Sequence, residues 1–109
     1  MKILSAQKCV PCEGGMAPLT LTKARILRRQ LHEDWKIAKD GKSIRRSLKF
    51  KDFYRTRSFV NALAHVANIE DHHPDLEVGY HYCHATFSTH SIGGLSENDF
   101  ICAAKLDRL

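Results

Sequence analysis

Three histidines stand where the sequence could carry out proton transfer. His72 and His73 directly precede Pro74, and His90 closes a Ser-Thr-His run. Imidazole titrates near neutral pH, with a reference pKa of about 6.5, so it can donate or accept a proton under physiological conditions. If the fold brings these three side chains together, they can perform general acid–base chemistry on a polar organic ligand.

A β-hairpin is the predicted element that brings His90 to the other two histidines. Residues 76–80 and 82–89 are two short strand-like segments joined by a tight turn. In that hairpin, paired residue numbers sum to about 162 or 163, which places His73 opposite Thr89 or His90. The loop after the preceding helix and the end of the second strand then meet at one edge of the sheet. The predicted site contains His72, His73, Ser88, Thr89 and His90.

Two other interpretations of these histidines stay open. A metal site would need three or four ligands that converge at about 2 Å, and adjacent histidines do not easily face one ion. Any single histidine could also be no more than a solvated loop residue. We expect no metal at this site, because a His-His-Pro turn, a Ser-Thr-His strand end and a helix start bearing Asp99 are predicted to converge there.

Residue periodicity predicts one α+β domain with the order α-β-β-α-β-β-α. Helices are expected over 20–32, over 52–70 and from Ser96 onward, where Asp99 stands at the capping-box position. A first hairpin is expected over 35–50, with a two-residue turn at Asp40-Gly41. Two hairpins with helices between them imply a four-stranded antiparallel sheet covered by helices on one face.

Individual positions within these elements are predicted as well. Arg46 falls on the same parity as the apolar residues of its strand, and Pro74 is expected to end the second helix by restricting His73. The expected inward-facing residues are Ala24, Leu27 and Leu31 in the first helix; Phe59, Val60, Leu63, Val66 and Ala67 in the second; Cys83, Ala85 and Phe87 in the last strand; and Phe100, Ala103, Ala104 and Leu106 in the last helix.

Residues 1–18 are predicted to form an irregular or mobile leader, and residues 19–109 the folded domain. The leader contains Cys9-Val-Pro-Cys12 followed by a Gly- and Pro-rich stretch, which disfavours regular structure. One Cys-x-x-Cys supplies half of a zinc site or a redox pair, and the sequence offers no second half nearby. We expect an ordinary thiol-bearing segment here, and we expect Cys83 and Cys102 to be small buried hydrophobic residues.

The charge and hydropathy of the chain restrict its partners. The formal net charge is +5, but acidic residues are interspersed among the basic ones, so we expect a solvated basic face rather than nucleic-acid binding. No apolar run approaches the roughly 20 residues that a membrane span needs. Lys2, Gln7 and Lys8 interrupt the core that a signal peptide would require. These features predict a cytoplasmic protein.

The motifs around the histidines resemble those of the pterin-4a-carbinolamine dehydratase family. They are Asp71-His72-His73-Pro74, Tyr80, Ser88-Thr89-His90 and Leu95-Ser96-Glu97-Asn98-Asp99, and the resemblance extends over residues 19–107. It implies the same α-β-β-α-β-β-α fold. It also implies dehydration of a 4a-hydroxytetrahydropterin to quinonoid dihydropterin, which recycles the cofactor of aromatic amino acid hydroxylases. Neither a metal nor an organic cofactor is implied.

The resemblance also implies roles for individual residues. His72 and His90 would transfer protons on opposite sides of the ring, and His73 would bind the pterin and share protons. Two positions depart from the family, since Asn68 is often acidic there and Leu76 is often an aromatic that covers the ligand. The substrate-binding set is Asp71, His72, His73, Pro74, Leu76, Ser88, Thr89, His90 and Asp99.

The sequence also predicts self-association and leaves open a second class of function. A small sheet with open edges favours self-association, and the resemblance implies a homodimer or a homotetramer. Some family members act as dimerisation cofactors of a transcription factor. The alternative to the enzyme is therefore a protein-binding regulator with the same fold.

Overall fold

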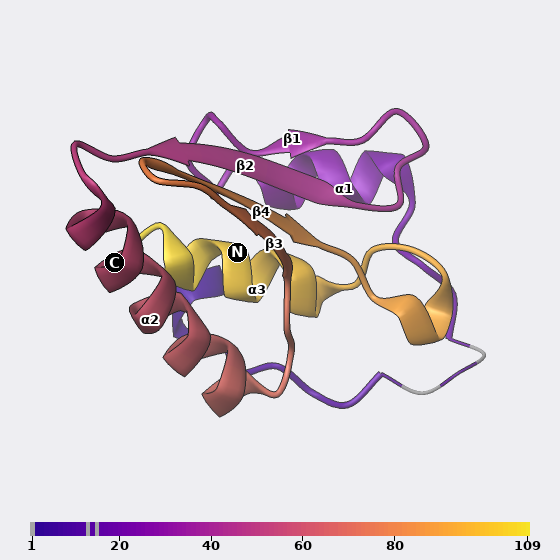
Figure 1. Cartoon of the computed structure of the whole chain (residues 1–109). Helices are drawn as coiled ribbons and strands as arrows, with labels where there is room; N and C mark the ends of the chain where they lie inside the picture. The colour runs from indigo at the N-terminus through magenta and orange to yellow at the C-terminus, as the bar shows by residue number, and fades with distance from the viewer. Residues whose placement is uncertain (1, 13, 15) are drawn as a thin grey trace.

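Four antiparallel strands form a sheet in the spatial order β1-β2-β4-β3, and the helices pack on one of its faces (Figure 1). The computed structural model describes residues 2–12, 14 and 16–109; Met1, Glu13 and Gly15, all in the predicted leader, lie outside the described residues. The fold class and the element order predicted from the sequence are confirmed. The elements are η1 (Leu4–Ala6), α1 (Leu21–Arg28), β1 (Lys36–Ile37), β2 (Ile44–Lys49), α2 (Phe53–Glu70), β3 (Asp75–Val78), β4 (Tyr82–Phe87), η2 (His90–Ile92) and α3 (Glu97–Leu106).

Helix α1 begins as predicted but ends earlier. The Thr20 side chain accepts a hydrogen bond from the backbone N–H of Lys23, which satisfies one of the free donors of the first turn. The helix ends at Arg28 rather than near residue 32. The Arg28 guanidinium donates to the backbone oxygens of Trp35 and Glu33, at 2.9 and 2.8 Å, and so turns the chain back toward the sheet.

The first hairpin is shorter than predicted and its loop is longer. Strand β1 has two residues, and Ala38 still donates to the carbonyl of Ser43, so the connection spans four residues rather than two. Gly41 lies in this loop with φ 71°, a backbone conformation that glycine adopts without strain. The turn residues Asp40-Gly41 therefore indicated the place of the turn but not its length.

An ion pair explains why Arg46 lies on the same face of β2 as the apolar residues. Its side chain is half-buried, and its Nη1 atom lies 2.6 Å from Asp107 Oδ1 at the end of α3. The same carboxylate accepts hydrogen bonds from the indole N–H of the fully buried Trp35 and from the backbone N–H of His32. The inward arginine is thus neutralised by a carboxylate that also satisfies two other donors.

Helix α2 covers the predicted residues, but Pro74 does not end it. Asp52 caps its start through a 2.9 Å bond from the backbone N–H of Arg55. At its other end, Asp71 adopts a left-handed conformation, with φ 51°. A residue in this conformation cannot continue a right-handed helix, so the helix ends at Glu70, four residues before the proline. His72 is thereby directed back toward the sheet.

The second hairpin forms in a register shifted from the predicted one. Val78 pairs with Cys83 and Asp75 with Thr86, one position away from the lower of the two predicted sums. Gly79 donates to the carbonyl of Tyr82 and closes the turn. Extended outward, this register puts Ser88, rather than Thr89 or His90, opposite His73. Strand β4 also ends at Phe87, two residues early, because η2 follows it.

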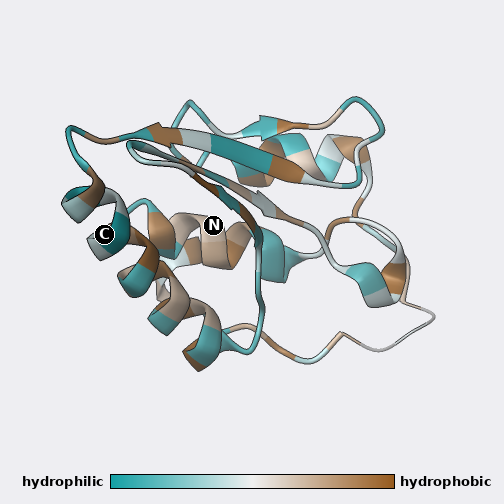
Figure 2. Ribbon diagram, in the orientation of Figure 1, coloured by the Kyte–Doolittle hydropathy of each residue, from teal (hydrophilic) through white to brown (hydrophobic). Residues whose placement is uncertain are grey.

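Helix α3 contributes to the core, and most of its residues are buried. Much of its ribbon has the tan to brown colour of apolar residues in Figure 2. The inward residues predicted for β4 are fully buried, as are Phe100 and Ala103 of α3. The leader also reaches this core, because η1 packs on α3 and the Leu4 side chain is buried in the apolar cluster. Among the described residues, none of the helices combines the length and the apolar composition that crossing a membrane requires.

Candidate active site

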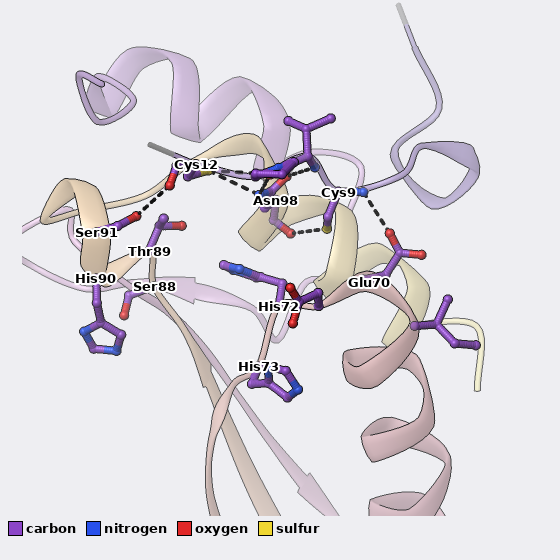
Figure 3. Close-up of a pocket in the computed structure, with 14 residues that line it drawn as sticks. Cys9, Cys12, Glu70, His72, His73, Ser88, Thr89, His90, Ser91 and Asn98 are labelled. Atoms are coloured by element: carbon purple, nitrogen blue, oxygen red, sulfur yellow. Dashed lines mark hydrogen bonds between the residues drawn. The ribbon is translucent and has the colours of Figure 1, made fainter. Parts of the chain in front are cut away.

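A cavity of about 620 Å³ opens where the leader, the end of α2, the end of β4 and the start of α3 meet (Figure 3). All five residues of the site predicted by hairpin register line it, together with Asp71. The convergence holds despite the register shift, because the chain after β4 turns through η2 instead of continuing as a strand. The lining residues are Cys9, Val10, Pro11, Cys12, Ile69, Glu70, Asp71, His72, His73, Ser88, Thr89, His90, Ser91 and Asn98.

His72 is held by a buried carboxylate. Its Nε2 atom lies 2.6 Å from Asp99 Oδ1, and the Asp99 side chain is completely buried. The imidazole also stacks on Phe87, with ring centroids 5.9 Å apart and an interplanar angle of 8°. An ionised carboxylate only accepts hydrogen bonds, so beside an ionised Asp99 the proton of this pair belongs on Nε2 and Nδ1 is left for a ligand.

Asp99 satisfies two further donors with its second oxygen. Oδ2 accepts from the Thr89 hydroxyl at 2.8 Å and from the backbone N–H of Ser96 at 2.9 Å. The Ser96 contact is the reciprocal half of the predicted capping box, so aspartate replaces the usual glutamate there without losing the bond. The residue that starts α3 therefore also fixes the orientation of His72.

His73 and His90 are exposed at the same cavity. His73 Nε2 lies 3.0 Å from Oδ1 of Asn68, one of the two positions at which the sequence departs from the resembled family. His90 starts η2, whose end Gly93 closes with a positive φ of 70° and a hydrogen bond to the His90 carbonyl. Figure 3 shows both rings at the cavity, on separate segments of the chain.

Three residues of the predicted substrate-binding set do not line the cavity. Asp99 acts on it only through His72, and Pro74 is half-buried in the loop beyond His73. Leu76 pairs with Ala85 and packs against the apolar core, so its side chain belongs to the inner face of the sheet. Direct ligand contact by these three residues stays a prediction.

The leader supplies a wall of the cavity that the sequence did not predict. The Asn98 side chain accepts from the Val10 N–H at 3.1 Å and donates to the Val10 carbonyl at 2.6 Å. Cys9 N–H donates to Glu70 Oε1 at 2.8 Å, and the Ser91 hydroxyl donates to the Cys12 carbonyl at 3.2 Å. The leader is thus fixed from three elements. Within the part of the chain that the structure describes, no group of three His, Cys, Asp or Glu residues is placed to hold a metal ion.

These leader contacts left little signal in the sequence. They join main-chain groups of the leader to single polar side chains far along the chain, and such pairs have no periodicity. Leu4, buried ahead of the Cys-x-x-Cys motif, is the one apolar residue that could have indicated a docked segment. Asn98 belongs to the Leu95–Asp99 motif, but nothing in the sequence indicates that its side chain binds the leader.

The model of the family described as Pterin 4 alpha carbinolamine dehydratase matches residues 17–109. The chain belongs to this family. Its resemblance to the family is therefore confirmed. Two bacterial relatives bear the provisional name pterin-4-alpha-carbinolamine dehydratase. The one from Legionella pneumophila (strain Lens) is 53% identical over 106 residues, which cover 97% of this chain and 94% of the relative. The one from Nitrosomonas europaea is 55% identical, with 97% and 92% covered.

One solved structure supports membership of the pterin dehydratase family, and a second shares the fold. A protein from Brucella melitensis, described as a transcriptional coactivator/pterin dehydratase, is 33% identical, with a TM-score of 0.78 over 84% of this chain and 96% of its own. A pterin dehydratase-like protein described as a RuBisCO assembly factor in the alpha-carboxysome is 23% identical, with a TM-score of 0.61 over 71% of this chain and 89% of its own. The second likeness concerns the fold alone.

Proposed function

We propose that this chain is a 4a-hydroxytetrahydrobiopterin dehydratase, which converts a 4a-hydroxytetrahydropterin to quinonoid dihydropterin in the cavity bounded by the three histidines. The reaction breaks the C4a–OH bond, removes a proton from the ring and releases water. It therefore needs one group that gives a proton to the departing hydroxyl and another that accepts the ring proton. Membership of the pterin dehydratase family supports the dehydration, and the site geometry supports the histidines as its agents.

The observation that carries the proposal is the 2.6 Å contact between His72 and the buried Asp99. A carboxylate that accepts from Nε2 selects the tautomer in which Nδ1 has a free lone pair, and it stabilises the positive charge that the ring gains on taking a proton. This arrangement suits His72 as the proton acceptor. Stacking on Phe87 further restricts the ring to one orientation.

His90 is the proposed proton donor, and His73 the proposed ligand-orienting residue. His90 is exposed on η2, where solvent can return its proton after each turnover. His73 leaves the same loop as His72 and is oriented by Asn68. We assign substrate contacts to Asp71, Ser88 and Thr89, partly through main-chain groups. The imidazoles provide both proton transfers, so the proposal includes no metal and no organic cofactor.

The test compares turnover of a 4a-hydroxypterin by the wild type with that of His72→Ala and His90→Ala. Each substitution should lower kcat by about 10²–10⁴-fold, because positioned acid–base groups typically contribute this much. His65→Ala, which removes an exposed histidine of α2, is the matched control and should leave turnover unchanged. Wild-type rates in both site variants would overturn the assignment. Turnover should also survive a metal chelator, and its loss would contradict the metal-free mechanism.

The physiological setting is also a proposal. A pterin released as the 4a-hydroxy form comes from an aromatic amino acid hydroxylase, so we infer that the chain recycles that cofactor in the cytoplasm. We also infer a homodimer or homotetramer, because β1 and β3 are open edges of the sheet. Mass measurement by light scattering would test this, and a monomer at micromolar concentration would contradict it.

A protein-binding regulator is the second candidate function. One solved relative is described as both a coactivator and a dehydratase, and α2 exposes Phe53, Tyr54 and Ile69 on this chain. Tyr54→Ser would separate the two functions, because Tyr54 is 71% exposed and lies outside the cavity lining. Loss of self-association or partner binding with full turnover would support a separate binding surface on α2. Unchanged association would remove this support.

A further inference from the structure

The thiols of Cys9 and Cys102 meet at the boundary between the leader and α3. Their sulfur atoms are 3.5 Å apart, although the residues are 93 positions apart in sequence. Cys102 is fully buried, whereas Cys9 is half-buried and lines the cavity. The two cysteines of the Cys-x-x-Cys motif therefore have different surroundings. Cys12 lies beside Asn98, at 3.2 Å from its Nδ2 atom, and Cys9 faces Cys102.

The backbone around Cys9 holds this arrangement. The N–H of Cys9 donates to Glu70 at 2.8 Å, and the next residue, Val10, is bonded on both its N–H and its carbonyl by Asn98. Glu70 is itself 3.7 Å from Lys105, one turn after Cys102 on α3. Since a disulfide needs sulfurs at about 2.05 Å, closure requires a shift of roughly 1.5 Å, which side-chain rotation can supply in large part.

We propose that Cys9 and Cys102 form a redox modification site, at which a hydroperoxide entering through the cavity converts the two thiols into a disulfide. In the first step the Cys9 sulfur attacks hydrogen peroxide; an S–O bond forms, the O–O bond breaks, and the departing hydroxide takes the Cys9 thiol proton and leaves as water. In the second step Cys102 attacks the Cys9 sulfenic acid; the S–S bond forms, and the released hydroxide leaves as water with the Cys102 proton. Hydrogen peroxide is reduced to two waters, and the thiols lose two electrons.

The order of the steps follows from access and from protonation. The hydrogen bond with Cys9 and the burial of its side chain raise the pKa of the Cys102 thiol far above its ordinary value, so Cys102 stays protonated. A protonated, buried thiol is a poor first nucleophile. Cys102 acts second because its sulfur lies 3.5 Å from the Cys9 sulfur, and it must give up its proton to the leaving hydroxide as the S–S bond forms. Cys9, at the cavity wall, is the sulfur that the oxidant reaches first.

The disulfide would fasten the leader covalently to α3 and so convert a hydrogen-bonded wall of the cavity into a fixed one. This inference does not depend on which reaction the cavity performs. It assigns the Cys-x-x-Cys motif a partner outside the motif. It also makes Cys12 a suitable internal control, because Cys12 lines the same cavity but its sulfur contacts Asn98.

The experiment treats the full-length protein with a slight molar excess of hydrogen peroxide, blocks the remaining thiols and maps peptides by mass spectrometry without reduction. A peptide pair joining Cys9 to Cys102, lighter by two hydrogen atoms and released by dithiothreitol, is the expected product. Cys12→Ser should form it in wild-type yield, and Cys9→Ser and Cys102→Ala should not form it at all.

Two results would overturn the proposal. One is a Cys9–Cys12 linkage as the main product in the wild type. The other is complete alkylation of both Cys9 and Cys102 after oxidation and unfolding, which would show that neither had reacted with the other. Both readouts use the wild type, so they stand even if the Cys102→Ala variant fails to fold. Thermal unfolding adds a check, because the oxidised wild type should melt at a higher temperature and dithiothreitol should reverse the shift.

Discussion

At the scale of single residues, Asp99 combines two tasks that are separate in many proteins. One carboxylate oxygen orients His72, and the other accepts from Thr89 and from the backbone of Ser96 at the start of α3. These three contacts lie inside the protein, where a donor left without an acceptor lowers the free energy of unfolding. A change at this residue must therefore affect the site and the helix start together.

Asp99→Asn tests this double role. If the amide turns its oxygen toward His72, its NH₂ group faces the donors of Thr89 and Ser96. If it turns its oxygen toward those two donors, its NH₂ group faces the N–H of His72. We expect activity to fall about 10–100-fold and the free energy of unfolding to fall by about 2 kcal/mol. Steady-state kinetics and urea denaturation measure the two effects.

Ser96→Ala is the matched control for Asp99→Asn, because it keeps the backbone N–H that Asp99 accepts from. It should cost about 1 kcal/mol of stability through the helix cap and leave turnover within a few-fold of the wild type. Equal activity losses in the two variants would mean that Asp99 matters only through the helix.

The buried thiols predict a loss of stability at alkaline pH. Burial raises the pKa of the Cys83 thiol, and the Cys9 contact with burial raises that of Cys102, from an ordinary value of 9.0. Above that pH the unfolded chain releases thiol protons that the folded chain retains, so the free energy of unfolding decreases as pH rises. The slope reaches about 1.4 kcal/mol per pH unit for each thiol.

Urea denaturation under reducing conditions between pH 8 and 10 would measure this slope. Cys102→Ala should flatten it by the contribution of one thiol, because lysine and tyrosine titration is common to both proteins. The same slope in the variant and the wild type would show that the native Cys102 thiol ionises as easily as an exposed one.

At the scale of elements, the sequence predicted those parts that side-chain patterns determine. The apolar stripe of α2, its start near Asp52 and the alternation of β4 all follow from residue type and spacing. The places where prediction failed are set by the backbone. Asp71 ends α2 in a left-handed conformation that its residue type permits but does not require, and the first hairpin loop has four residues where Asp40-Gly41 could make a two-residue turn.

The same distinction explains the candidate site. The convergence of His72, His73 and His90 followed from topology and tolerated a register error, because the loop positions meet at one edge of the sheet. The wall built by the leader could not be predicted, since Asn98 bonds to main-chain atoms of Val10 that every residue type offers. The resemblance predicts direct contact between Leu76 and a ligand. The side chain packs against the core, and the contact stays a prediction.

The clamp between Asn98 and the leader predicts a change in substrate affinity. Asn98→Asp keeps the acceptor for the Val10 N–H but replaces the donor to the Val10 carbonyl with a negative oxygen, so the leader should detach there. Assuming the proposed reaction, KM for the pterin should rise about 3–10-fold, the equivalent of one ordinary hydrogen bond, with kcat nearly unchanged.

Asn61→Asp makes the same chemical change at an exposed position of α2 and serves as the control for the leader clamp. It should leave both constants unaltered. A fall in kcat at constant KM for Asn98→Asp would show that the leader serves catalysis rather than binding.

At the scale of the whole molecule, Asp107 links the end of α3 to β2 and to the segment between α1 and β1. It binds Arg46 of β2, the indole of Trp35 and the backbone of His32 after α1. Three residues between positions 32 and 46, each more than 60 positions from Asp107 in sequence, therefore share its carboxylate. Arg46 and Asp107 are only 16% and 15% exposed, so solvent screens their attraction weakly.

Asp107→Ala should lower the free energy of unfolding by about 3 kcal/mol, because it leaves a half-buried guanidinium and two N–H groups without an acceptor. The double variant Arg46→Met/Asp107→Asn should be more stable than Asp107→Ala, since methionine suits the inward parity of β2 and the amide oxygen can still accept from Trp35. Denaturant titration of the three proteins measures this. A double variant less stable than Asp107→Ala would mean that the charge itself, rather than its neutralisation, stabilises the fold.

The leader wall also sets an order for the completion of the cavity. Val10 is synthesised early, but its partner Asn98 lies 88 residues further along the chain and belongs to α3. During vectorial synthesis the leader remains undocked, with Leu4 exposed, until α3 has been synthesised. The sheet and α2 can assemble before that point. Ligand binding should therefore be the last property that a nascent chain acquires, later than the native-like circular dichroism of its sheet and helices.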